Sequence, residues 1–257
     1  MDGQPRILDH LHDRRGARPG TLDQWFAAQG DRGWDPFYRL ARESPALLDE
    51  AALDLLDGQA AEHPGALTAL LIGLAATDGA RRAALSDRCR SHLRRHPVNA
   101  LAVAGNRLHE FHRVLDPAWI AIAREAYVHH PEGAWGILRA AALYETHLLD
   151  LGLLPWLREH RGDAPEAFAV VLLSLALAHP AERDALVAEV VAAISDHPAA
   201  TLAGAVLCAK DEAVLLEAGL IEVAVERIAT DQPVEVRAPA WDLLAGAVQV
   251  VPRAFDE

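Results

Sequence analysis

Three side chains that could bind a metal ion lie on one predicted helix in the first half of the chain. Cys89, His92 and His96 are spaced three and four residues apart, so they share one helical face, and zinc prefers thiolate and imidazole ligands. However, His96 directly precedes a proline, and Cys89 stands where comparable segments carry Ala, Leu or Val. We therefore prefer a structural role for these residues and predict no metal site.

Other patterns fall short of catalytic signatures. The segment HEFH at 109–112 lacks the second histidine of H-E-x-x-H, because Arg113 stands in its place. No phosphate-binding glycine loop and no G-x-S-x-G nucleophile motif occurs in the sequence. We assign no catalytic residue, expect no cofactor, and favour a binding protein over an enzyme.

A histidine pair, His129 and His130, precedes a proline that belongs to a regular series. The series is Pro64, Pro97, Pro131, Pro165, Pro198 and Pro233, at intervals of 33 to 35 residues. Proline fixes φ, lacks an N–H and disfavours helix at the preceding residue, so it ends one helix and serves well in the first turn of the next. The series indicates repeats, and the residue before each proline is a candidate helix cap.

Apolar residues recur at fixed distances from these prolines. The third, seventh and eleventh positions after each proline are almost all apolar, as with Leu67, Leu71 and Ala75. They form one stripe of a helix. The eighth position before the next proline marks a second helix in each unit: Cys89, Ala123, Leu157, Val190 and Val225.

This pattern predicts an all-α fold. We expect an α-solenoid of about six two-helix repeats over residues 64–257, because one helix pair cannot bury its apolar face alone. We expect the last repeat to be atypical, since Pro239 falls inside its first helix.

Parts of the chain resemble known helical repeats. LLEAGLIEVAVERIATDQPVEVRAPAWDLLAGAV (215–248) resembles an armadillo or HEAT unit, and LLDLGLLPWLREH (148–160) resembles its opening. AREAYVHHPEGAWGIL resembles a TPR junction, with Trp135 four residues after Pro131, and the period near 34 is that of TPR units. The small residue expected four positions beyond the Trp-like position occurs only as Gly105. The resemblance implies a helical-repeat protein that binds proteins or peptides.

Residues 1–63 differ from the rest of the chain. Aromatic residues cluster there, and Thr21 with Gln24 forms a capping-box pattern at the start of a short helix. The cluster contains Trp25, Phe26, Trp34, Phe37 and Tyr38. We interpret this segment as a helical cap on the first repeat, with an aromatic ligand pocket as the alternative. The composition of the first 20 residues is compatible with partial disorder.

Charge is unevenly distributed. The net charge of −13 argues against general nucleic-acid binding. Residues 64–131 nevertheless carry nine basic and five acidic side chains, whereas residues 132–257 carry eight and twenty. Arg81, Arg88 and Arg95 are spaced by seven and line one helical face. This basic patch is either a solvated outer face or a docking site for an acidic partner.

The helices that follow the prolines are apolar nearly all round, which predicts an apolar inner groove. The fifth and ninth positions after each proline should face it. Our candidate groove residues are Asn106, Val170, Ser174, Leu207 and Asp242 at these positions, together with Trp135 and Arg139, which stand one residue before them. We expect another protein or a peptide there, with a second copy of this chain as one candidate. A double substitution of Val170 and Leu207 by arginine should abolish that association and leave the fold intact.

Cellular context follows from absences in the sequence. Only two cysteines occur, no signal-like apolar segment stands at the start, and no apolar stretch is long enough to span a membrane. We expect a cytoplasmic protein without membrane contact, and the excess of Arg over Lys suggests a GC-rich bacterial source.

Two other functions stay open. The first is an enzyme similar to the HEAT-like alkylpurine DNA glycosylases, for which Asp116, Trp119 and Arg139 supply the residue types. The second is an acidic inhibitor or immunity-type protein that uses the acidic half of the chain against a basic target.

Overall fold

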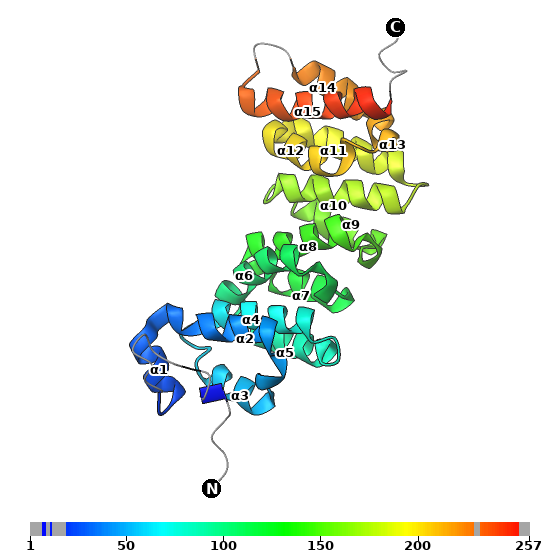
Figure 1. Cartoon of the computed structure of the whole chain (residues 1–257). Helices are drawn as coiled ribbons and strands as arrows, with labels where there is room; N and C mark the ends of the chain where they lie inside the picture. Colours follow the sequence, from blue (N-terminus) through cyan, green and yellow to red (C-terminus); the bar gives the residue numbers. More distant parts are fainter. Residues whose placement is uncertain (1–6, 9–10, 12–18, 229–231, 252–257) are drawn as a thin grey trace. The chain divides into compact units, whose positions relative to one another are not determined.

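The fold is known from a computed structural model that describes residues 7–8, 11, 19–228 and 232–251. Within these residues all regular secondary structure is helical and no strand occurs (Figure 1). The all-α prediction is therefore confirmed. The prediction of disorder for residues 1–20 falls largely outside the described residues. No helix in the described part of the chain has the length and hydrophobicity needed to cross a bilayer.

The chain divides into two compact units. Among the described residues, the first comprises those up to 115 and 121–134, and the second comprises 116–120 and those from 135 to 251. The helices up to the division are α1 (Leu22–Gln29), α2 (Asp35–Glu43), α3 (Glu50–Gly58), α4 (Pro64–Thr77), α5 (Arg82–Arg95) and α6 (Pro97–Glu110). Helices α7 (Pro117–Ala126) and α8 (Pro131–Tyr144) contribute residues to both units. The second unit continues with α9 (Leu154–Glu159), α10 (Pro165–Ala178), α11 (Arg183–Asp196), α12 (Pro198–Ala209), α13 (Ala213–Leu215), α14 (Ile221–Arg227) and α15 (Val234–Val250).

Short 3-10 and π segments join these helices. The 3-10 turns are η2 (Gly30–Trp34), η3 (Pro45–Leu47), η4 (His112–Val114), η5 (Tyr127–His129), η6 (Thr146–Leu148) and η7 (Leu151–Leu153). The π segment η8 (Leu216–Leu220) contains Gly219, whose φ of 125° is open to glycine and strained for other residues. This glycine lets the chain turn between α13 and α14.

The prolines mark helix boundaries as the sequence predicts. Five of the six are the first residue of a helix, namely of α4, α6, α8, α10 and α12, and Pro233 directly precedes α15. His130 adds a cap, because its Nδ1 accepts a hydrogen bond of 2.9 Å from the backbone N–H of Gly133. The histidine pair is thus part of a helix junction. Pro239 lies inside α15, as expected.

The apolar columns form the core. Every residue at the third, seventh and eleventh positions after the six prolines is buried, including Leu138 and Leu172 at 0% exposure. Cys89, Ala123, Leu157 and Val190 of the second helices are also 0% exposed. Val225 is the exception at 51%, and Ala224 is buried instead. The interval from Pro198 to Pro233 is the longest of the five, and in it the core position lies nine residues before the proline instead of eight.

Small residues allow close approach among the helices that start at the proline series, namely α4, α6, α8, α10, α12 and α15, which we call the proline-led helices. A Cβ atom on Gly105 of α6 would lie 2.7 Å from the carbonyl oxygen of Gly133. A Cβ on Gly204 of α12 would collide with the backbone carbonyl of Glu166 in α10. Gly246 of α15 lies in the same way against the carbonyl of Lys210, the residue after α12. Within each unit, successive proline-led helices therefore pack backbone against backbone.

Candidate functional site

A hollow in the N-terminal unit lies where α2 packs against α4. Two side chains of these helices bond to carbonyl groups across the contact. The hydroxyl of Tyr38 donates to the carbonyl oxygen of Ala66 at 3.1 Å, and that of Thr77 donates to the carbonyl oxygen of Ala41 at 2.9 Å. Burial raises the pKa of Tyr38 to about 12, against a smaller opposing effect of Arg107, so the hydroxyl stays a proton donor. The position of α2 is thereby fixed.

Two hollows share this wall, and together they form what we call the α2–α4–α6 cleft. The first has a volume of about 240 Å³ and the second, more open one, about 490 Å³; both are lined by Tyr38, Ala69 and Arg107. The first is completed by Ala41, Arg42, Leu70, Gly73, Thr77, Glu110 and Phe111. The second is completed by Trp34, His63, Gly65, Ala66, Val103 and Asn106.

The cleft combines an apolar floor with a charged edge. Ala69 and Leu70 are buried in α4, and Gly73 leaves space, since a Cβ atom built on it would meet nothing within 4 Å. Arg107 and Glu110 form an ion pair of 2.8 Å one turn apart on α6. Together with Arg42, which is exposed, the edge carries two positive charges and one negative charge. Such a surface suits a ligand with an apolar anchor and an acidic neighbour.

The predicted aromatic cluster is mostly a core beside this cleft. Trp25, Phe26, Trp34 and Phe37 are at most 6% exposed. The rings of Phe26 and Trp34 lie 5.0 Å apart, and that of Phe37 lies 5.9 Å from Phe26. The indole N–H of Trp25 donates to the carbonyl of Gly33 at 2.9 Å, whereas that of Trp34 has no partner among the described residues. Only Trp34 and Tyr38 of the cluster also line the cleft.

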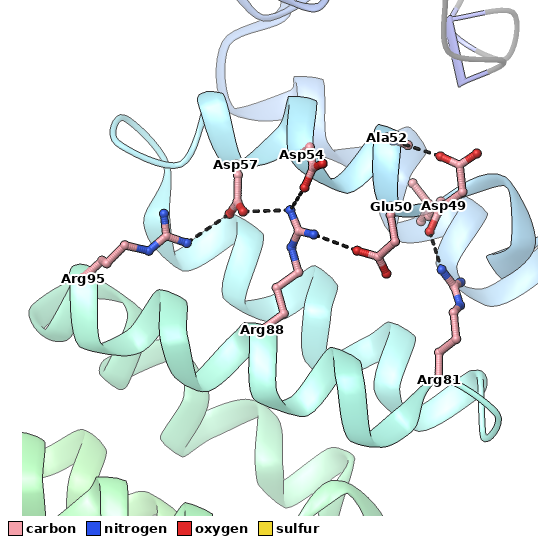
Figure 2. Close-up of polar contacts among 9 residues, drawn as sticks. Asp49, Glu50, Ala52, Asp54, Asp57, Arg81, Arg88 and Arg95 are labelled. Atoms are coloured by element: carbon pink, nitrogen blue, oxygen red, sulfur yellow. Dashed lines mark hydrogen bonds and ion pairs between the residues drawn. The ribbon is translucent and has the colours of Figure 1, made fainter. Parts of the chain in front are cut away.

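The predicted basic patch is not a free positive surface. Figure 2 shows Arg88 of α5 at the centre of a ladder of contacts with the acidic face of α3. Its guanidinium lies 2.9 Å from Glu50, 2.8 Å from Asp54 and 2.7 Å from Asp57. Arg95 also reaches Asp57, at 3.5 Å.

The third arginine of the patch is bonded within the chain as well. Arg81 forms an ion pair of 2.7 Å with Asp78 and donates to the carbonyl oxygens of Leu48 and Pro45, each at 2.9 Å. These arginines hold α5 against the segment that contains α3 and are paired within the chain, and the docking interpretation of the patch stays a prediction. The sequence contained a sign of this pairing, because Glu50, Asp54 and Asp57 stand at helical spacing and form an acidic face that can pair with the arginines.

The predicted groove residues separate into two groups. Asn106, Leu207 and Asp242 are exposed, and Asn106 lines the α2–α4–α6 cleft. Val170, Ser174 and Trp135 are at most 3% exposed. The expectation that Val170 faces an open groove does not hold, because α10 is covered by both α11 and α12.

Specific contacts account for the other members of the groove set. The hydroxyl of Ser174 donates to the carbonyl oxygen of Ala142 at 3.0 Å. Trp135 packs on Trp156 with ring centroids 5.3 Å apart. Arg139 is paired with Glu166 at 3.0 Å. These three side chains serve packing within the C-terminal unit.

The remaining chemical candidates also have structural roles. Cys89 and His92 are buried, and burial raises the pKa of the Cys89 thiol to about 12. No group of three potential ligands (His, Cys, Asp or Glu) is close enough to hold a metal ion in the part of the chain that the structure describes. Asp116 accepts backbone hydrogen bonds from Ala118 and Trp119 at the start of α7, and Trp119 is 0% exposed. A buried Trp119, a capping Asp116 and an ion-paired Arg139 do not favour the glycosylase alternative.

Sequence reasoning missed most of the cleft. Arg42, Arg107, Glu110 and Phe111 were not singled out, although the last three fall in one turn at the end of α6. No protein family, curated protein or solved structure matches this chain. The geometry of the cleft therefore carries the functional argument alone.

Proposed function

We propose that this chain is a helical-repeat binding protein that holds a peptide segment of a partner protein in the α2–α4–α6 cleft. The observation that carries the proposal is the preformed hollow of about 240 Å³, with Leu70 and Phe111 among its apolar walls and Arg107 at its edge. A hollow of this volume fits one or two apolar side chains, and the adjoining hollow of about 490 Å³ offers room for the residues that flank them. An apolar anchor residue of a peptide is therefore the matching ligand.

The charges at the edge define the peptide further. Arg42 is exposed, and Arg107 forms an ion pair with Glu110 among the described residues. An acidic residue next to the apolar anchor would gain an ion pair with either arginine, at the cost of little desolvation at an exposed rim. We expect such a residue to affect association rate and selectivity more than affinity.

A repeat architecture is part of the same proposal. Helices α4, α6, α8 and α10 have the same length of 14 residues and the same proline start. We propose that residues 64–257 form an α-solenoid of about six helix pairs, with residues 1–63 as its N-terminal cap. Support comes from the contacts of α4 with α6 and of α10 with α12, which join helices of neighbouring pairs. Helical solenoids commonly present peptide-binding surfaces, so this architecture agrees with the proposed activity.

The test is a substitution that fills the cleft without disturbing the fold. Gly73→Leu places a side chain in open space and replaces a helix-breaking residue with a good helix former. A random peptide library is selected for binding to the intact natural chain. We expect the selection to enrich peptides with an apolar residue next to an acidic one. Fluorescence anisotropy of the enriched peptides should then show at least a tenfold loss of affinity for Gly73→Leu.

A matched control is available in α3. Gly58→Leu also introduces leucine at a helical glycine whose Cβ would meet nothing within 4 Å, but this residue does not line the cleft. It should bind the enriched peptides like the natural chain. Equal binding by Gly73→Leu and Gly58→Leu, or failure of the library to enrich any peptide, would overturn the proposal.

A further inference from the structure

An exposed apolar stripe runs along the whole length of α15. Val234, Trp241 and Val248 are 59%, 56% and 54% exposed, and Ala238 and Ala245 between them are also exposed. The five residues are spaced four, three, four and three apart, which is the spacing of a helix-packing seam. Isolated exposed valines are common on protein surfaces, but a continuous apolar stripe marks an interaction site.

The stripe has the register of a face that is covered elsewhere in the chain. Counted from Pro233, its members are the first, fifth, eighth, twelfth and fifteenth residues. The eighth residue after Pro97 is Gly105, which lies against the start of α8 at Gly133. At this position, the face of α6 that corresponds to the stripe therefore meets the next proline-led helix, α8.

The C-terminal unit repeats this relationship twice. The first residue after Pro165 is Glu166, whose carbonyl lies against Gly204 of α12. The twelfth residue after Pro198 is Lys210, whose carbonyl lies against Gly246 of α15. At these three positions (Gly105, Glu166 and Lys210) the register of the α15 stripe therefore lies against the next proline-led helix, although Val98, at the first position of α6, is 51% exposed. The chemistry of the stripe accordingly fits another α-helix.

Two surfaces of a second copy could supply the helix that covers the stripe: the exposed face of α2 and the α15 stripe itself. The charge on the α2 face decides between them. The exposed side chains of α2, which covers α4, include Asp35, Arg39, Arg42 and Glu43. Pairing this face with the apolar stripe of a second copy would bury charges without partners, which is costly. A head-to-tail chain of copies through α2 is therefore disfavoured. The stripe itself is the apolar surface that matches.

The stripe is also self-complementary. Val234 and Val248 are each seven residues from Trp241, so an antiparallel pair of α15 helices centred on Trp241 brings Val234 of one copy opposite Val248 of the other. Such pairing creates a two-fold symmetric interface, the commonest form among homo-oligomers. We propose that two copies of this chain associate through α15, with Trp241 at the two-fold axis. This interface is independent of the cleft and of the peptide proposed to fill it.

The test measures mass and the environment of Trp241. Sedimentation equilibrium of the full chain, from low to high micromolar concentration, should show a monomer–dimer equilibrium. Trp241→Arg and Val248→Arg should each give the mass of one chain throughout, with unchanged far-UV circular dichroism. Val128→Arg is the control, because Val128 is 76% exposed and lies outside the stripe, and it should dimerise like the natural chain.

A second reading uses quenching of tryptophan fluorescence by acrylamide. Trp241 is the most exposed tryptophan of those that the structure describes, so quenching should fall as concentration rises in the natural chain. It should stay constant in Val248→Arg. A natural chain that remains monomeric at high micromolar concentration would overturn the proposal, and so would a dimer that survives both arginine substitutions.

Discussion

Arg88 of α5 and Asp57 of α3 form an ion pair of 2.7 Å in which the arginine side chain is only 17% exposed. Burial opposes the charge on Arg88, but hydrogen bonds and charge interactions with Asp54 and Asp57 outweigh it, so the pKa of Arg88 is raised above its usual value. One arginine therefore contacts all three carboxylates of this face and offsets part of their negative charge. This arrangement joins the segment before the first proline to the first proline-led helix pair.

Arg88→Gln should destabilise the chain by about 1–2 kcal/mol, because it removes charge-assisted hydrogen bonds and leaves three carboxylates close together. The change can be measured as a lower urea midpoint with an unchanged m value. Arg94→Gln is the control, since Arg94 has a single pair of 3.3 Å with Glu125 and both side chains are more than half exposed. A loss of stability in Arg94→Gln equal to that in Arg88→Gln would contradict the assignment.

Two glycine-to-alanine substitutions should have opposite effects. Gly204→Ala adds a Cβ atom against the carbonyl of Glu166 and should cost about 1–3 kcal/mol, because two helix backbones must move apart. Gly73→Ala adds a Cβ in open space and should stabilise α4 by up to about 1 kcal/mol through helix propensity. Thermal unfolding of both variants provides the comparison. The same sign for both would show that the close approach at Gly204 is not a real constraint.

His92 should make the stability of the chain depend on pH. Burial lowers its pKa, its Nε2–H donates to the carbonyl oxygen of Pro64 at 2.9 Å, and its Nδ1 is buried with no partner among the described residues. Protonation would place a second N–H where no acceptor lies. The unfolded state therefore binds this proton at a higher pH than the folded state does.

Neutral His92 therefore contributes fully to the stability of the fold above its pKa in the unfolded state, about 6.5. This stability is lost as the pH falls from that value toward the lower pKa of His92 in the folded state. Urea unfolding at several pH values should show the loss in the natural chain and a smaller one in His92→Gln. His147→Gln, at an exposed histidine, should behave like the natural chain. Identical pH profiles for the natural chain and His92→Gln would contradict this role.

Val170→Arg and Leu207→Arg should differ strongly in their effect on the stability of the fold. Val170 is 0% exposed, so an arginine there would be a buried charge without a partner and should cost several kcal/mol, enough to unfold the chain. Leu207 is 46% exposed, and arginine there should change stability by less than about 0.5 kcal/mol. Circular dichroism of the two single variants distinguishes them. A folded Val170→Arg variant would show that α10 is not enclosed.

Part of the candidate site was accessible from the sequence. Trp34 and Tyr38 were selected as aromatic residues and Asn106 as a polar residue at a groove position, and all three line the cleft. Arg107 and Glu110 were not selected, because charged residues at helical spacing usually form solvated faces and nothing in the local pattern sets them apart. Their importance depends on α2, which lies about seventy residues earlier in the chain.

Local and periodic signals determined the helices and their core. The φ restriction of proline acts within the chain itself, so the helix starts at Pro64, Pro97, Pro131, Pro165 and Pro198 followed from the sequence. The buried columns followed too, since helical periodicity places every fourth or third residue on one face whatever the partner is. The tertiary structure alone decided which charged and apolar faces meet. Arg88 is neutralised by α3, Val170 is enclosed by α11 and α12, and Trp241 is left exposed on α15. These outcomes depend on contacts between residues that are distant in sequence, and a single sequence carries no local signal for such pairings.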